Sequence, residues 1–225
     1  MKLSIPKEHL LTGLQAVQNV VGSRTTLPIL SNVLLVASEG KLELTATDLD
    51  VTISCTVPAT VEKPGRTTVP VKRIFGIARE LAAPEIDIEV DEKAVMALRA
   101  GGSFFKINGL TGEEFPPVNL LKQARVVTLP QETLKAMLRK TSFAASSDEA
   151  RYVLNGIFFS FKEHKVTLVA TDGRRLAMTE EDADVPAEAK AEFIVPTKAI
   201  NELNRLLTGN RSEEHTSELQ SPCNL

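Results

Sequence analysis

The apolar residues of the chain first follow helical spacing and then strand spacing. The first helical run contains Leu10, Leu11, Leu14 and Val17. Runs rich in strand-forming residues follow at 32–38, 41–47, 51–57, 86–90, 94–100 and 103–109. Glu39 and Gly40 separate the first two of these runs, which predicts a hairpin, and a second helix is predicted directly after Pro70.

The same order of elements returns further along the chain. A helical pattern contains Leu134, Met137 and Leu138, a hairpin is predicted from runs 156–161 and 165–171, and a helix follows Val195-Pro196. Individual residues return too, at an offset of 124 (Asp48 to Asp172) that becomes 126 (Lys72 to Lys198). A period of roughly 125 residues is too long for a solenoid repeat and suits a tandem domain.

The pattern therefore predicts an α+β fold with two similar domains, each containing antiparallel sheet and two helices. The first domain is placed at 1–125 and the second at 126–210. The second domain stops before the counterparts of the last three strands of the first. Without those strands, we expect uncovered apolar faces at Ile157, Phe159 and Phe161.

The composition is that of a globular protein, with 225 residues, 43% hydrophobic and 24% charged. No early segment resembles a signal peptide and no apolar run reaches the length of a membrane helix, so a cytoplasmic location is expected. The formal net charge of -3 means that any surface for DNA must be local. The two cysteines, Cys55 and Cys223, have no disulfide or metal-site spacing.

The last fifteen residues, 211–225, are highly polar and continue no earlier pattern. Residues 211–221 resemble a translated sequencing-library adapter. We expect this segment to be a non-native tail, so His215 and Cys223 carry no functional weight.

The repeated Thr-Asp pair, at Thr47-Asp48 and Thr171-Asp172, has two interpretations. An aspartate at the end of a strand caps a turn by accepting hydrogen bonds from nearby backbone N–H groups. A metal-dependent nuclease using Asp48 and Asp172 is the alternative, but no histidine or cysteine cluster accompanies them. The sequence also has no phosphate-binding glycine loop or nucleophile elbow, so we predict no catalytic residue, metal or cofactor.

The second helix of each domain repeats a pair of cations. Lys72 and Arg79 are seven residues apart, as are Lys198 and Arg205, so each pair lies near one helix face. A solvated helix face is one interpretation. Recurrence in both domains favours contacts to phosphate groups, which give affinity without reading sequence.

Several segments in order resemble the bacterial sliding clamp family, the beta subunit of DNA polymerase III. They are SRTTLPILSNVLL, LTATDLDV, TTVPVKRIF, EEFPPV, RYVLNGIFF and VATDGRRLA. The resemblance covers residues 1–210 and implies tandem DNA-clamp domains, three per chain. Two such chains would form a ring around duplex DNA, with helices lining the hole and sheets outside.

The resemblance also implies roles for particular residues. DNA contacts would come from Arg24, Lys72, Arg73, Arg79, Lys198 and Arg205. One wall of a pocket for the peptides of clamp-binding proteins would consist of Leu154, Thr171, Gly173, Arg174, Arg175 and Leu176. Family members often have histidine at the position of Arg174. Phe105 and Ile107 would contact the neighbouring chain, with ordinary core packing as the alternative.

The predicted function is that of a non-enzymatic processivity factor. Its expected partners are double-stranded DNA, the polymerase III catalytic subunit, the clamp loader, other proteins with clamp-binding motifs and a second copy of the chain. The nuclease and a DNA-binding module that forms no ring remain the alternatives.

Overall fold

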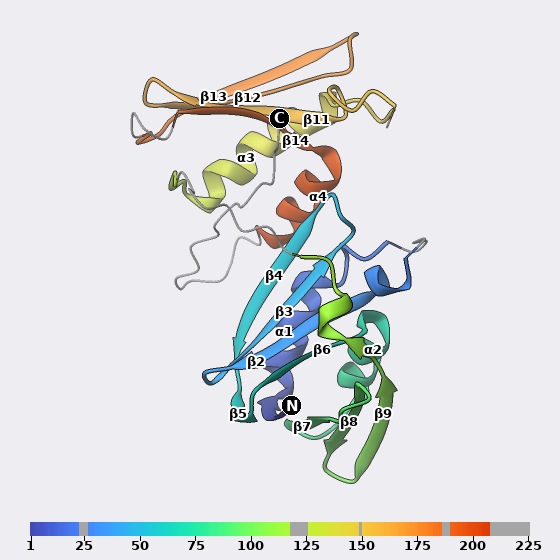
Figure 1. Ribbon diagram of the computed structural model, residues 1–225. Helices are drawn as coiled ribbons and strands as arrows, with labels where there is room; N and C mark the ends of the chain where they lie inside the picture. The colour runs from blue at the N-terminus through green and yellow to red at the C-terminus, as the bar shows by residue number, and fades with distance from the viewer. Residues whose placement is uncertain (23–26, 118–125, 149, 186–189, 208–225) are drawn as a thin grey trace. The chain divides into compact units, whose positions relative to one another are not determined.

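A computed structural model describes residues 1–22, 27–117, 126–148, 150–185 and 190–207. The chain divides into two compact units, Met1–Val118 and Asn119–Leu225 (Figure 1). The expected tail at 211–225, with His215 and Cys223, lies outside the described residues. None of the helices within the described ranges has the length and hydropathy needed to cross a membrane.

Unit 1 contains two antiparallel sheets and two helices. The first sheet has the order β5-β1-β7-β8-β9, with β5 Thr60–Lys63, β1 Lys2–Pro6, β7 Glu85–Val90, β8 Val95–Ala100 and β9 Ser103–Asn108. The second has the order β10-β6-β2-β3-β4, with β10 Leu110–Thr111, β6 Gly65–Pro70, β2 Asn32–Ser38, β3 Lys41–Thr47 and β4 Thr52–Pro58. The helices are α1 Lys7–Val17 and α2 Val71–Glu80, and short 3-10 turns occupy η1 Pro28–Ser31 and η2 Gly112–Glu114.

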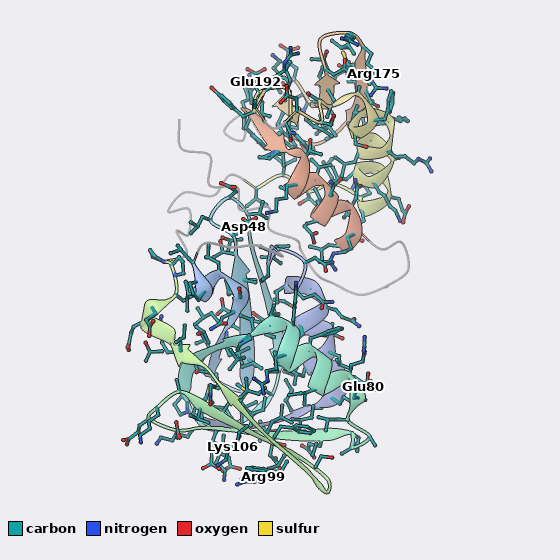
Figure 2. The ribbon with its side chains drawn as sticks, turned by 90° about the vertical axis from the view of Figure 1, so that its right-hand side faces the viewer. Asp48, Glu80, Arg99, Lys106, Arg175 and Glu192 are labelled. Carbon is teal, nitrogen blue, oxygen red and sulfur yellow. The ribbon has the colours of Figure 1, made fainter. Side chains whose placement is uncertain are left out.

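The core of unit 1 is built from alternate residues of both sheets and from one face of each helix. Val33 and Leu35 of β2 are fully buried, while the intervening Leu34 is only half-buried. Leu14 of α1 and Ile74 of α2 belong to the same buried cluster. The opposite face of the first sheet carries Arg99 and Lys106, which point away from the helices (Figure 2).

Unit 2 repeats the second sheet and both helices of unit 1. Its elements are α3 Gln131–Thr141, η3 Ser142–Ala144, β11 Gly156–Lys162, β12 Lys165–Thr171, β13 Leu176–Asp182, β14 Ala191–Pro196 and α4 Thr197–Leu206. The sheet order β13-β12-β11-β14 matches β4-β3-β2-β6. The registers match as well, since Thr171 pairs with Leu176 where Thr47 pairs with Thr52. The predicted repeat and the α+β class are confirmed.

The predicted exposure of the apolar face of β11 is wrong. Ile157, Phe159 and Phe161 are 1%, 2% and 8% exposed. The helices α3 and α4 cover this face, because α3 packs on β12 and β13 while α4 packs on β11 and β14. The rings of Phe159 and Phe193 stack at a centroid distance of 5.7 Å, which closes the core further.

Unit 2 does not reproduce the first strand of unit 1, as segment 126–130 shows. This segment corresponds to β1 but forms no strand. In unit 1, β1 is held between β5 and β7. By the repeat offset a counterpart of β7 would begin only at about residue 211, outside the described residues, so segment 126–130 has no such partner within them.

Proline marks the start of all four helices of the described residues. Pro6, Pro70, Pro130 and Pro196 each precede a helix, with φ between -59° and -56°. The ring fixes φ near this value and removes an N–H that a helix start would leave unpaired, so proline stops the preceding extended segment without blocking the helix.

The hairpin turns adopt the left-handed backbone that two-residue connections require. Glu39 and Gly40 have φ of 48° and 75°, and the corresponding Glu163 and His164 have 55° and 61°. The β2–β3 and β11–β12 hairpins therefore turn in the same way, although the second contains no glycine.

Candidate functional site

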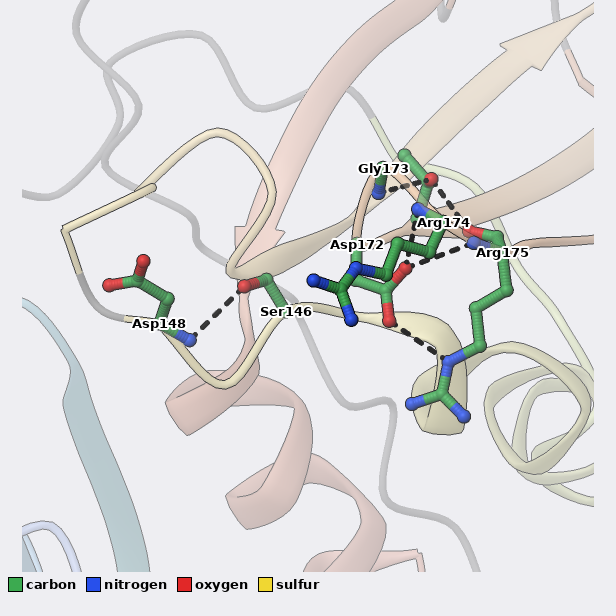
Figure 3. A network of polar contacts seen from close by, with 7 residues as sticks. Ser146, Asp148, Asp172, Gly173, Arg174 and Arg175 are labelled. Carbon is green, nitrogen blue, oxygen red and sulfur yellow. Dashed lines mark hydrogen bonds and ion pairs between the residues drawn. The ribbon is translucent and has the colours of Figure 1, made fainter.

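The segment from Thr171 to Leu176 forms a tight turn between β12 and β13 (Figure 3). The Asp172 carboxylate accepts hydrogen bonds from the backbone N–H groups of Arg174 and Arg175, at 2.9 and 3.0 Å. The Thr171 hydroxyl accepts from the Gly173 N–H at 3.1 Å and donates to the Arg175 carbonyl at 2.7 Å. Gly173 has φ of 87°, a conformation that glycine adopts without steric cost.

Unit 1 contains the same turn after β3. The Asp48 carboxylate, labelled in Figure 2, accepts from the backbone N–H groups of Asp50 and Val51 at 3.1 and 2.8 Å. The Thr47 hydroxyl accepts from Leu49 N–H and donates to the Val51 carbonyl. The turn-capping interpretation of the Thr-Asp pairs is therefore confirmed.

The electrostatics of Asp172 agree with this structural role. The backbone N–H of Arg174 and then that of Arg175 lower the pKa of the Asp172 carboxyl, because they stabilise its charged form. The Arg175 guanidinium, with Nε 3.1 Å from Oδ2, acts in the same direction. Across the described residues, no group of three or more histidine, cysteine or acidic side chains is arranged to hold a metal.

The predicted peptide wall lies at one end of the sheet of unit 2. Because β11 and β12 are antiparallel, with Phe158 paired to Val169, residues just before β11 lie at the same end as residues just after β12. Leu154 is half-buried, and its carbonyl accepts from the Ser146 N–H at 2.9 Å, which fixes the loop beside the turn.

The turn itself presents exposed groups from this end of the sheet. Gly173, Arg174 and Arg175 are exposed, and Leu176 is 65% exposed. The Arg175 guanidinium lies 5.8 Å from the centroid of the Phe143 ring, a cation–π distance. A surface with open backbone, an aliphatic side chain and two guanidinium groups can bind an extended apolar peptide that carries acidic groups.

Sequence reasoning missed three exposed apolar side chains of unit 2, one in η3 and two in the loop before β11. Phe143, Tyr152 and Val153 are 60%, 81% and 52% exposed. The sequence offered one signal for them, namely large apolar residues that lie outside the runs with helix or strand spacing.

The second helices of the two units present cations at equivalent positions. Lys72 and Lys198 are the second residues of α2 and α4, and Arg79 and Arg205 are the ninth. Lys72 and Arg79 are exposed, together with Arg73. Arg24 lies outside the described residues.

The arginines of these two helices are not equally available. Arg79 pairs with Glu80 at 3.0 Å and is 65% exposed, whereas Arg205 pairs with Glu202 at 2.9 Å and is 33% exposed. Lys7 of α1 donates to the Arg79 carbonyl at 3.0 Å, which ties the end of α2 to the rest of unit 1. In both ion pairs the Nε atom contacts the carboxylate, and a nearby carboxylate weakens the attraction of either arginine for a phosphate.

The two residues of β9 with a predicted interface role differ in environment. Phe105 is 39% exposed, and it borders a hollow of ≈260 Å³ beside Ile77 and Leu81. Ile107 is fully buried in the core of unit 1. This burial supports the core interpretation of Ile107. Of the two side chains, Phe105 is the one with exposed area that could contact a neighbouring chain.

Comparison with known proteins places this fold and these segments in one family. Residues 1–120 match the DNA polymerase III beta subunit, N-terminal domain, and residues 128–217 match its central domain. The beta sliding clamp of Chlamydia muridarum is 35% identical over 206 residues, which are 92% of this chain and 56% of that protein.

Solved structures agree. The DNA polymerase sliding clamp of Bacillus subtilis superposes with a TM-score of 0.90 at 30% identity, covering 94% of this chain and 58% of that one. The DNA polymerase III subunit beta of Pseudomonas aeruginosa gives 0.86 at 39% identity, with 92% and 57% covered. The fold is thus that of a sliding clamp. The chain belongs to the DNA polymerase III beta subunit family, and it spans little more than half the length of these relatives.

Proposed function

We propose that residues 1–125 and 126–210 are the first two domains of a sliding clamp, with the second incomplete. Two full-length chains would close into a ring around duplex DNA in the cytoplasm, without cofactor or metal. The ring would be a non-enzymatic processivity factor that tethers the polymerase and raises its effective concentration at the primer end.

One observation carries the proposal for DNA. Cations recur at the same two positions of equivalent helices, α2 and α4, although the residues around them differ. Contacts from Lys72, Arg79, Lys198 and Arg205, with Arg24 and Arg73, would be contacts to phosphate. Such contacts do not read sequence, which suits a ring that slides.

The peptide wall is the proposed docking site for partner proteins. Leu154, Thr171, Gly173, Arg174, Arg175 and Leu176 would form it. The polymerase III catalytic subunit, the clamp loader and other proteins with clamp-binding motifs would place a short peptide there. Phe105, at the edge strand β9, would contribute to the contact with the second chain.

The full-length protein provides the test of DNA binding. A variant with alanine at Lys72, Arg79, Lys198 and Arg205 is expected to be retained less well on nicked circular DNA. The slope of log affinity against log salt should flatten by about one unit for each phosphate that the variant no longer neutralises.

A matched control removes four exposed lysines outside these helices, at Lys41, Lys63, Lys93 and Lys106. It should keep the salt slope of the parent. An equal slope in both variants would contradict the proposal, and equal retention on short linear and circular DNA would favour a DNA-binding module that forms no ring.

A further inference from the structure

The outer face of the second sheet of unit 1 contains a groove of ≈480 Å³. Its floor is formed by Leu34, Val36 and Thr45, on the face of β2 and β3 opposite the core. Its wall is formed by Phe115, Pro116 and Pro117, in the segment that follows β10 and η2. Figure 1 shows this green segment returning across the sheet beside β6.

The groove is held open by contacts within unit 1. The Arg66 guanidinium donates from Nη2 to the Gly112 carbonyl. A Cβ atom at Gly112 would lie 2.6 Å from Arg66 Nε, so glycine is required for this close approach. Phe115 is only 5% exposed. The wall is therefore packed in place before any ligand arrives, which lowers the entropy lost on binding.

The charged side chains around the groove differ in whether they have a hydrogen-bond or ion-pair partner. The Arg66 guanidinium, which also lines the groove, donates to the Gly112 carbonyl but keeps its positive charge, and Glu114 accepts a hydrogen bond from the Thr111 hydroxyl at 3.1 Å. Glu43 and Glu113, which also line the groove, are exposed, and neither forms an ion pair within the described part of unit 1. The two carboxylates outnumber the single guanidinium of Arg66, so the apolar floor has a border of net negative charge, which complements a ligand that is apolar and cationic.

We propose that this groove binds an extended segment of a partner protein in which arginine or lysine accompanies apolar side chains. Its volume lies within the range of about 300–1,000 Å³ that is usual for ligand pockets. Acidic peptides and nucleic acid fit less well, because repulsion by Glu43 and Glu113 outweighs attraction by the single Arg66. The groove lies on the sheet face opposite the core and α2, so its occupation leaves Lys72 accessible.

The test uses two matched probes on the full 225-residue chain. One is a blocked pentapeptide of alternating arginine and leucine, and the other has glutamate in place of arginine. Binding is followed by the methyl resonances of Leu34 and Val36. The arginine peptide should shift these resonances and the glutamate peptide should not. Replacing Glu43 and Glu113 by glutamine should weaken the arginine peptide about threefold for each charge, or about tenfold together.

The control variant removes two exposed carboxylates elsewhere in unit 1, Glu8→Gln with Glu92→Gln, and should change affinity less than twofold. Val36→Lys places a cation inside the groove and should abolish binding while the circular dichroism of the chain is retained. Equal binding of both peptides, unshifted groove methyls with the arginine peptide, or equal losses in test and control variants would overturn the proposal. The proposal for the groove does not rest on the proposed ring. Support for it or its failure therefore leaves the proposed sliding-clamp function unchanged.

Discussion

Replacing Gly173 by alanine should destabilise the β12–β13 turn by about 1 kcal/mol. The φ of 87° places an L-residue in the left-handed region at roughly 1–2 kcal/mol. No atom lies within 4 Å of the added Cβ, so steric overlap contributes nothing further. The lower entropy of the unfolded alanine chain offsets roughly 0.4–1 kcal/mol of this strain.

Unit 1 provides the reciprocal experiment, because Leu49 occupies the equivalent position with φ of 82°. Leu49 is 59% exposed, and Leu176, a strand residue, is 65% exposed. Leu→Gly at either position loses some apolar burial and adds unfolded-chain entropy, about 1.5 kcal/mol together. At Leu49 the relief of backbone strain cancels most of that loss, so Leu49→Gly should be nearly neutral and Leu176→Gly should destabilise its turn by about 1.5 kcal/mol.

Hydrogen exchange with mass spectrometry measures each unit separately, in peptides spanning 42–57 and 166–181. Faster exchange is expected in the second peptide for Gly173→Ala and Leu176→Gly, and unchanged exchange in the first peptide for Leu49→Gly. If Leu49→Gly accelerated exchange as much as Leu176→Gly, backbone strain at this turn position would be refuted.

Two further predictions concern buried hydroxyls and pH. Thr67→Val should raise the free energy of unfolding of unit 1 by about 1 kcal/mol, because the Thr67 hydroxyl is buried with no hydrogen-bond partner in the described structure. The control Thr68→Val should lower it by about 1–3 kcal/mol in the same denaturant titration, since that hydroxyl bonds Asn32 and Leu110; equal effects would contradict the assignment. Because the pKa of Asp172 is lowered, its stabilisation of the turn should be complete above the ordinary carboxyl pKa and lost as pH falls through the lower folded value. Carboxyl and amide NMR shifts between pH 6 and 2 would show this, and an ordinary pKa in the folded chain would exclude it.

Local signals in the sequence were sufficient for the helices and for the main hairpins. Proline followed by helical spacing located α1 to α4, and adjacent apolar runs located β2–β3 and β11–β12. Strands such as β1 and β6 were not recognised. Both end in proline, and their partners are distant, as in the pairing of Lys2 with Glu89. Their extended conformation is fixed by tertiary pairing that no local pattern displays.

Burial of individual side chains was harder to predict than the elements. The three apolar residues of β11 were expected to be uncovered, but α3 and α4 suffice to cover their face. Ile107 and Phe105 have the same strand alternation, yet Ile107 lies in the core cluster of unit 1 whereas Phe105 borders a surface hollow. These differences in burial depend on how whole helices and strands pack together, and the spacing of apolar residues along the chain does not reveal that packing.

In the two Thr-Asp turns, the residues that fix the backbone conformation are different from the residues that determine the exposed surface. Thr47-Asp48 and Thr171-Asp172 make the same hydrogen bonds, so they fix one backbone path in both units. The side chains at the three positions that follow differ between the units, because the hydrogen bonds common to both turns use only backbone groups there. Unit 1 fills them with Leu-Asp-Val and unit 2 with Gly-Arg-Arg. The second set exposes backbone and two guanidinium groups beside Leu176, whereas the first exposes a leucine and a carboxylate. The peptide-binding role proposed for unit 2 alone would depend on three side-chain positions on a shared scaffold, and moving Gly-Arg-Arg into unit 1 should transfer the turn's surface while keeping the hydrogen bonds that the two turns share.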